Sequence, residues 1–194
     1  MSPAETEAVI RQAMQLFWQK GTDVPFSHIV EATGQSRKTL YAVFGDKATL
    51  VGAALGMYRQ EVLTPMMALL DPPNGTAVYW DTYERAAQLP GWLGCLLVRT
   101  ATGEGKDQEL VQDAFRSYSN QFVAAMKAAY IREGEVGDPE KSAWAAFGLM
   151  VSISALAGSG GLDDRVSALF SAARAANGLL PSGSGDIEDD MAAS

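Results

Sequence analysis

Residues 34–50 read GQSRKTLYAVFGDKATL, and this stretch decides the fold of the N-terminal part of the chain. Ser36 is a suitable N-cap for a short helix over residues 37–44, and Gly45 is suited to end that helix. Asp46 offers a second N-cap, for a longer helix that follows directly. The stretch therefore predicts a short helix held between two tight turns.

Two further helices are expected upstream. Apolar residues recur at three- and four-residue steps over residues 3–20, which predicts an amphipathic helix that ends at Gly21. A short helix is expected over residues 26–33, with Pro25 before it and Gly34 ending it in the left-handed conformation. Two short helices joined by a tight turn and braced by a third form a helix-turn-helix, whose second helix enters the major groove of DNA. The apolar face of the first helix comprises Ala8, Ile10, Ala13, Met14, Leu16 and Phe17.

The rest of the chain is also expected to be helical. Pro65 should kink or end the fourth helix, and the run DPPNG at residues 71–75 predicts a loop. The residues after 180 are small, acidic and poor in apolar side chains, so we expect a disordered tail. Further helices are predicted over residues 77–88, 92–102, 106–132, 139–157 and 162–179. The predicted fold class is all-α.

Charge is distributed unevenly along the 194 residues, whose net charge is −8. Residues 1–52 hold five basic and five acidic side chains, and the remainder holds 10 basic and 18 acidic ones. Three of the N-terminal cations fall within residues 37–47. An acidic body disfavours nonspecific contact with nucleic acid, so any such contact is expected at the N-terminal part.

Several classes of protein are disfavoured. The chain has one histidine, His28, one cysteine, Cys95, and no nucleophile-elbow, P-loop or metal-ligand motif, so we expect no enzyme, cofactor or metal site. Residues 142–162 form an uncharged run, but serines and glycines dilute it, which favours a buried helix over a membrane span. The absence of a signal-peptide pattern and the single cysteine favour the cytoplasm.

The residues of the short helix over 37–44 can be assigned from its periodicity. Leu40 and Phe44 share the inward face, which leaves Arg37, Lys38 and Tyr41 more exposed. Arg37 and Lys38 lie at the N-terminal end, which reaches base edges, and they are the candidates for sequence specificity. Phosphate contacts are expected from Ser36, Thr39, Tyr41 and Lys47.

The segments AMQLFWQKG, IVEATGQS and SRKTLYAVFGDKATL closely resemble the N-terminal signature of TetR-family regulators. This resemblance implies an all-helical homodimer with a three-helix DNA-binding head and a larger body that binds a small molecule. The head is assigned to residues 1–48 and the ligand-binding and dimerisation body to 49–180, and the acidic tail inferred from composition follows over 181–194. GCLLVRTA at residues 94–101 is similar to a body motif of one TetR subgroup.

The resemblance also implies roles for single residues. Recognition-helix contacts fall on Arg37, Lys38, Thr39 and Tyr41, a contact of the preceding helix falls on Ser27, and the phosphate-binding lysine is Lys47. Three positions depart from the family pattern: Val43 stands where many members have histidine, Gln35 replaces an apolar residue, and Pro25 replaces a capping Ser or Thr.

The body is expected to hold a small apolar or aromatic ligand and to dimerise. Aromatic residues suited to a pocket are Trp80, Tyr83, Trp92, Phe115 and Phe122. Cys95 is expected to be a small buried hydrophobe more often than a thiol sensor. A dimer interface could be built by Phe147, Val151 and Ala155 with Val166, Leu169, Phe170 and Ala173; the alternative is that these residues form core within one chain.

Together these observations predict a DNA-binding transcriptional regulator, a repressor released from a palindromic operator by a small molecule. The alternative is a helical ligand-binding or protein-interaction module that has lost specific DNA binding, since the head has no net positive charge.

Overall fold

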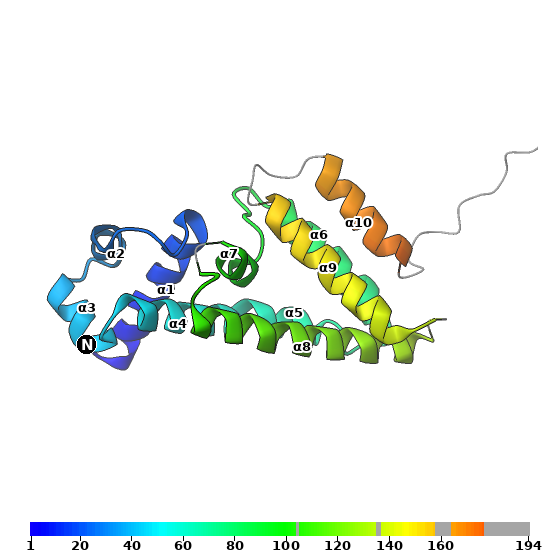
Figure 1. Ribbon diagram of the computed structural model, residues 1–194, viewed down its shortest axis with the longest axis horizontal. Coiled ribbons are helices and arrows are strands. Elements are labelled where there is room, and N and C mark those ends of the chain that lie inside the picture. Colours follow the sequence, from blue (N-terminus) through cyan, green and yellow to red (C-terminus); the bar gives the residue numbers. More distant parts are fainter. Residues whose placement is uncertain (104, 135–136, 158–163, 177–194) are drawn as a thin grey trace, which may run out of the picture.

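The computed structural model describes residues 1–103, 105–134, 137–157 and 164–176, and its regular elements there are all helices (Figure 1). The expected all-α class is confirmed. The acidic tail expected at residues 181–194 lies outside the described residues. The elements are α1 Pro3–Lys20, α2 Phe26–Thr33, α3 Arg37–Phe44, α4 Lys47–Tyr58, the π-helical turn η1 Arg59–Leu63, α5 Thr64–Ala68, α6 Gly75–Ala87, α7 Leu96–Thr102, α8 Glu109–Glu133, α9 Pro139–Ala157 and α10 Asp164–Ala176.

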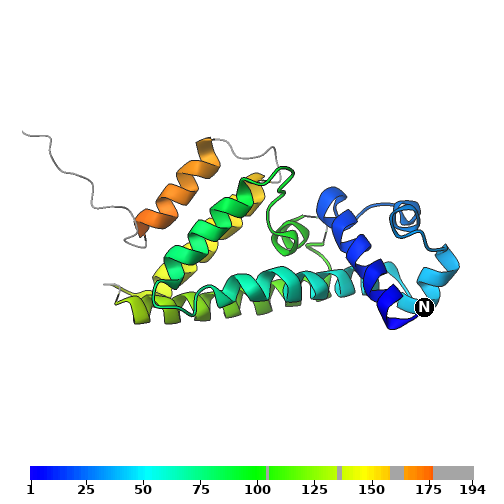
Figure 2. The same cartoon turned by 180° about the vertical axis from the view of Figure 1, so that it is seen from behind.

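Helices α1 to α3 form a small head at one end of the molecule (Figures 1 and 2). Their observed bounds agree with those predicted. The Ser36 hydroxyl accepts the Thr39 N–H at 3.0 Å, which is the expected N-cap of α3. One detail of α1 was predicted wrongly, because Val9 is buried and Ala8 is exposed.

Pro65 does not end the fourth helix, which was one of the two outcomes predicted for it. The chain runs from α4 through η1 into α5, and Pro65 lies in the first turn of α5. Proline lacks a backbone N–H and crowds the preceding turn. That turn is π-helical, with the Thr64 N–H donating to the Arg59 carbonyl. The wider π-helical turn therefore accommodates Pro65, which has no backbone N–H to donate.

The body stacks its helices in layers on a long base (Figures 1 and 2). The segment α4 to α5 lies beside α8, and α6 and α9 cross above them, with α10 packed on α6 and α9. The apolar side chains of these layers form one core with those of the head. The body therefore shares a continuous interior with the head.

Helix α7 begins later than predicted, at residue 96 instead of 92. Gly91 and Gly94 have φ values of +75° and +82°, so the preceding segment is a loop that only glycine forms readily. A Cβ atom on Gly94 would lie 2.3 Å from the Ser154 carbonyl oxygen. Gly94 therefore lets the loop pass directly against α9.

The residues predicted to form the dimer interface lie mostly inside the chain. Val166, Phe170 and Ala173 of α10 are at most 1% exposed. The Phe170 ring is edge-on to Trp80, with centroids 6.5 Å apart. For these three side chains the dimer prediction was wrong, because α10 packs on α6 and α9 and buries them within one chain.

No helix within the described ranges is long and apolar enough to cross a membrane. Across the same residues, no group of His, Cys, Asp and Glu side chains is arranged to hold a metal ion.

Candidate functional site

Helix α3 presents a polar face at the end of the head. Leu40 and Phe44 are buried, as the spacing predicts, while Arg37, Lys38 and Tyr41 are exposed. Tyr41 is 46% exposed, a high value for an aromatic side chain. The two cations at the N-terminal end of α3 are therefore free to approach a partner from solvent.

The side chains at the start of α3 are stacked against α2. The Phe26 ring lies parallel to the Tyr41 ring, with centroids 4.8 Å apart and an angle of 7° between their planes. The Arg37 guanidinium lies over the same Phe26 ring, 5.1 Å from its centroid. This cation–π contact restricts the long arginine side chain before any partner arrives. Phe26, the first residue of α2, was not among the predicted site residues.

The other predicted DNA contacts lie around this face. Ser27 is exposed on α2, and Thr39 is half-buried with its hydroxyl 2.8 Å from that of Ser36. Lys47, in the first turn of α4, donates from Nζ to the Val24 carbonyl at 2.8 Å. The head thus brings all seven predicted residues to one end of the molecule, and Lys47 also fastens α4 to the loop before α2.

The body contains a partly open cavity of about 160 Å³ beside the head. Helix α4 and η1 supply Tyr58, Val62 and Leu63, and α5 supplies Met66. The remaining lining residues come from α1, α6, α8, α9 and the loop before α7; they are Trp18, Tyr79, Tyr83, Ala86, Leu89, Trp92, Gly94, Cys95, Tyr118 and Met150.

Only two of the five predicted ligand residues, Tyr83 and Trp92, line this cavity. Trp80 packs against Phe170, Phe122 against Tyr79, and Phe115 against Phe147, all within the layers of the core. Tyr58, Tyr79, Tyr118 and Trp18 were missed. Their helical positions mark them as inward-facing, but the sequence carries no sign of which inward residues border a void.

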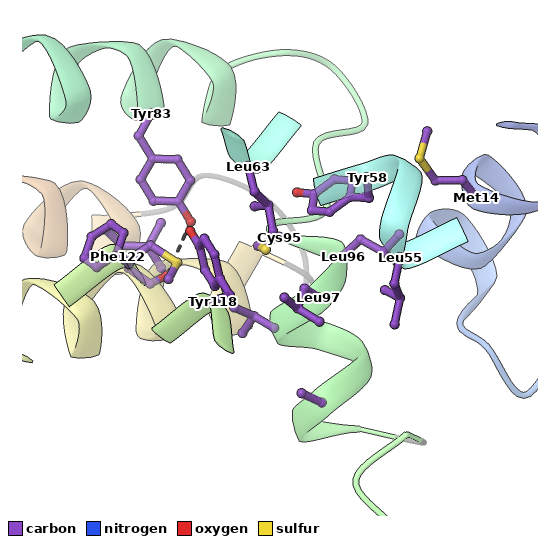
Figure 3. Close-up of a cluster of buried hydrophobic side chains, with 14 of the residues drawn as sticks. Met14, Leu55, Tyr58, Leu63, Tyr83, Cys95, Leu96, Leu97, Tyr118 and Phe122 are labelled. Atoms are coloured by element: carbon purple, nitrogen blue, oxygen red, sulfur yellow. Dashed lines mark hydrogen bonds between the residues drawn. The ribbon is translucent and has the colours of Figure 1, made fainter. Parts of the chain in front are cut away.

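On the cavity wall, Tyr58 lies on one side of Cys95, and Tyr83 and Tyr118 lie on the other (Figure 3). The Tyr58 hydroxyl is hydrogen-bonded to the Cys95 sulfur, and the Tyr83 hydroxyl lies 2.6 Å from Ser154 Oγ. Burial raises the pKa of Tyr58, Tyr83 and Cys95, so all three keep their protons at neutral pH. A buried, protonated thiol is a weak nucleophile, in agreement with the expectation that Cys95 acts as a small hydrophobe.

Trp18 connects the head to this cavity. Its indole belongs to α1 and lies edge-on to Tyr58, with centroids 5.6 Å apart. The indole N–H donates to the Gly94 carbonyl at 2.8 Å, and the Trp18 carbonyl accepts a hydrogen bond from Arg99 of α7. The cavity wall and the helix that braces α2 and α3 therefore share one side chain.

Residues 9–54 match the family model of bacterial regulatory proteins of the tetR family. This segment therefore has the sequence of a TetR-type DNA-binding domain. The matched segment covers most of α1, all of α2 and α3, and the first turns of α4. The chain is also 42% identical over 55 residues to the HTH-type transcriptional repressor ComR of Escherichia coli; that match spans 28% of this chain and 26% of ComR.

Solved structures extend the similarity of fold to the body. The reduced form of NemR from Escherichia coli has a TM-score of 0.76 at 17% identity, covering 89% of this chain and 96% of NemR. CifR, a TetR-family regulator solved as a cysteine mutant with 26-bp operator DNA, has a TM-score of 0.75 at 22% identity, covering 90% of this chain and 96% of CifR. A regulator from Streptomyces avermitilis has a TM-score of 0.69 at 21% identity, covering 87% of this chain and 97% of that regulator. The TetR fold thus spans both parts of this chain.

Proposed function

We propose that this regulator is a homodimeric repressor, which binds a palindromic operator through α3 and is released by a small apolar or aromatic ligand. The observation that carries the proposal is the exposed, capped helix α3 with two cations at its N-terminal end. In a helix-turn-helix this end of the second helix approaches the base edges. We assign the head to residues 1–48 and the body to residues 49–180.

Contacts to DNA divide into two kinds. Arg37 and Lys38 read base edges in the major groove, where a guanidinium bonds guanine in a bidentate manner. Ser27, Ser36, Thr39, Tyr41 and Lys47 contact phosphates and fix the position of the head. The stacking of Arg37 on Phe26 supports this division, because an oriented guanidinium loses less side-chain entropy on binding.

A homodimer supplies the second recognition helix. One helix-turn-helix makes few contacts, whereas a twofold dimer places two recognition helices roughly 34 to 36 Å apart on one face of DNA. Small residues occupy the outward face of α9, and a Cβ atom on Gly148 would meet nothing within 4 Å. Such faces let helices of two subunits approach closely. The exposed small residues on the outward faces of the two last helices are Ala145, Gly148, Ser152 and Ala155 of α9 and Ala168, Ser171, Ala172 and Ala175 of α10.

Ligand release follows if the cavity prefers one arrangement of the head. A ligand shifts the equilibrium only by its differential affinity for the two states, and about 1.4 kcal/mol gives a tenfold loss of operator affinity. The cavity is lined by Trp18 of the head and by Tyr58 of α4, the helix that begins at Lys47. An occupant would therefore contact the two helices that position α3.

The test measures binding to the DNA upstream of the protein's own gene by fluorescence anisotropy over a range of salt concentrations. Arg37→Ala and Lys38→Ala should each weaken binding by about 1–3 kcal/mol and relax specificity. Arg116→Ala, which removes an exposed cation of α8, is the matched control and should leave affinity unchanged. Unchanged affinity in the two α3 variants would favour the alternative, a ligand-binding or interaction module without specific DNA binding.

A further inference from the structure

The size of the cavity limits its occupant. Its volume is about 160 Å³, close to the roughly 150 Å³ of an engineered apolar cavity that holds benzene. The cavity therefore accommodates a molecule of about one aromatic ring.

The charge of the wall limits the occupant further. The lining residues, all within the described part of the chain, include no Asp, Glu, Lys, Arg or His. A charged ligand would lose its hydration without gaining a counter-charge, and that loss costs far more than burial of apolar surface returns. The occupant is therefore uncharged.

The wall favours a flat ring. Trp18 and Tyr58 meet edge to face on one side, and Tyr83 and Trp92 meet in the same way on another, with centroids 5.6 Å apart in both pairs. Aromatic rings attract one another in edge-to-face and offset arrangements beyond the gain from buried area. A ring placed among these four side chains continues the same packing.

The Tyr118 hydroxyl is a hydrogen-bond donor on the cavity wall. The Tyr58 hydroxyl is hydrogen-bonded to Cys95, and that of Tyr83 to Ser154. The Tyr79 hydroxyl donates to that of Tyr118, a bond that uses the Tyr79 proton and not the Tyr118 proton. Tyr118 lines the cavity beside Tyr83 and Cys95 (Figure 3). A buried donor is stabilised by an acceptor within hydrogen-bond distance.

We infer that the cavity binds an uncharged, single-ring aromatic molecule that carries an oxygen atom able to accept a hydrogen bond from Tyr118, as a simple phenol does. This inference rests on the ligand-responsive function proposed above and specifies the class of the ligand. It also assigns Tyr118 as the residue that distinguishes an oxygen-bearing ring from a hydrocarbon.

The first experiment is calorimetric titration of the full chain with phenol, benzoate and benzylamine at pH 7. Phenol should bind, and it should change the fluorescence of the tryptophans, since Trp18 and Trp92 line the cavity. Benzoate and the benzylammonium ion, of similar size but charged, should bind at least tenfold more weakly. Absence of phenol binding, or equal binding of either ion, overturns the inference.

Two variants locate the site. Tyr118→Phe should weaken phenol binding about three- to tenfold, the range expected for one net hydrogen bond, and leave toluene binding unchanged. Ala86→Leu fills the cavity and should abolish binding of both. Ala128→Leu, at an exposed position of α8, is the matched control and should bind both as the unmodified protein does. If Tyr118→Phe weakens the binding of toluene as much as that of phenol, the proposed role of the Tyr118 hydroxyl is contradicted.

These titrations contain no DNA, so their outcome is separate from that of the operator experiment. If Arg37→Ala retains full affinity for DNA while phenol binds as stated, the proposed regulatory function fails and the ligand class stands. If Arg37→Ala loses DNA affinity and phenol does not bind, the ligand class fails alone.

Discussion

The indole N–H of Trp18 donates to the Gly94 carbonyl at 2.8 Å, which joins α1 of the head to the loop before α7 of the body. Both residues also line the cavity. The same hydrogen bond thus borders the candidate ligand site and holds α1, the helix that packs against α2.

Trp18→Phe tests this connection. The variant keeps an aromatic ring but leaves the Gly94 carbonyl without its donor, which should lower the free energy of unfolding by about 1–2 kcal/mol. Urea denaturation followed by circular dichroism measures the change. Trp144→Phe, at a position that is 48% exposed, is the control and should alter stability by less than about 0.5 kcal/mol. Equal effects of the two variants would show that the Trp18 hydrogen bond contributes nothing.

Gly94→Ala should be much more disruptive than Gly91→Ala. Both glycines have positive φ values, so each alanine costs about 1–2 kcal/mol in backbone strain. Only at Gly94 would the new Cβ also collide with the Ser154 carbonyl, 2.3 Å away, whereas Gly91 has open space around it. Thermal unfolding should show the cost of backbone strain in Gly91→Ala and the added cost of the collision in Gly94→Ala. Similar melting temperatures of the two variants would contradict the close approach of the loop and α9.

Ser36→Ala should destabilise the head through its lost N-cap. The Ser36 hydroxyl accepts from the Thr39 N–H, and such caps contribute about 0.5–2 kcal/mol. Ser27→Ala is a matched substitution at an exposed site of α2, where the hydroxyl makes no cap. Chemical denaturation should therefore show a loss for Ser36→Ala alone. A similar loss for both serines would argue against the cap.

Lys47→Met separates a structural from a DNA-binding role of this lysine. Loss of the Nζ bond to Val24 should lower stability by about 1 kcal/mol. If Lys47 also contacts a phosphate, the slope of log affinity against log salt should fall by about one. A lower stability with an unchanged slope would restrict Lys47 to its bond with the loop.

High pH should destabilise the body. Burial raises the pKa values of Tyr58, Tyr79, Tyr83 and Tyr118, so the folded chain keeps these protons where the unfolded chain releases them. Their contribution to stability is therefore complete below about pH 10, the ordinary tyrosine pKa, and is lost as pH rises beyond it. The melting temperature should fall above that pH, and Tyr118→Phe should flatten the fall. An exposed-site variant, Tyr41→Phe, should leave the pH profile as it is.

The head could be predicted closely because its signals are local. Ser36, Asp46 and the glycines at 21, 34 and 45 specify caps and turns by their own backbone chemistry, and the structure has the three helices where these residues predict them. The contact between Arg37 and Phe26 could not be foreseen, since it depends on how α2 and α3 are oriented.

The positions of side chains in the body were harder to predict, because they depend on contacts between helices that are far apart in the sequence. Aromatic residues at inward positions are plain in the sequence, but Trp80 fills a packed layer while Tyr83, three residues later, faces a void. That difference arises from the helices that pack around α6. The same reason explains the misplaced dimer residues, because Phe170 has the periodicity of an interface and the surroundings of a core.

The π-helical turn at Arg59–Leu63 holds one residue more than an α-helical turn would. A deletion of a single residue there could restore α-helical spacing without breaking the chain, whereas elsewhere along α4 it would rotate every following side chain out of register. A change of one residue at this turn would therefore alter the shape of the cavity wall while the sequence of α3 stays as it is.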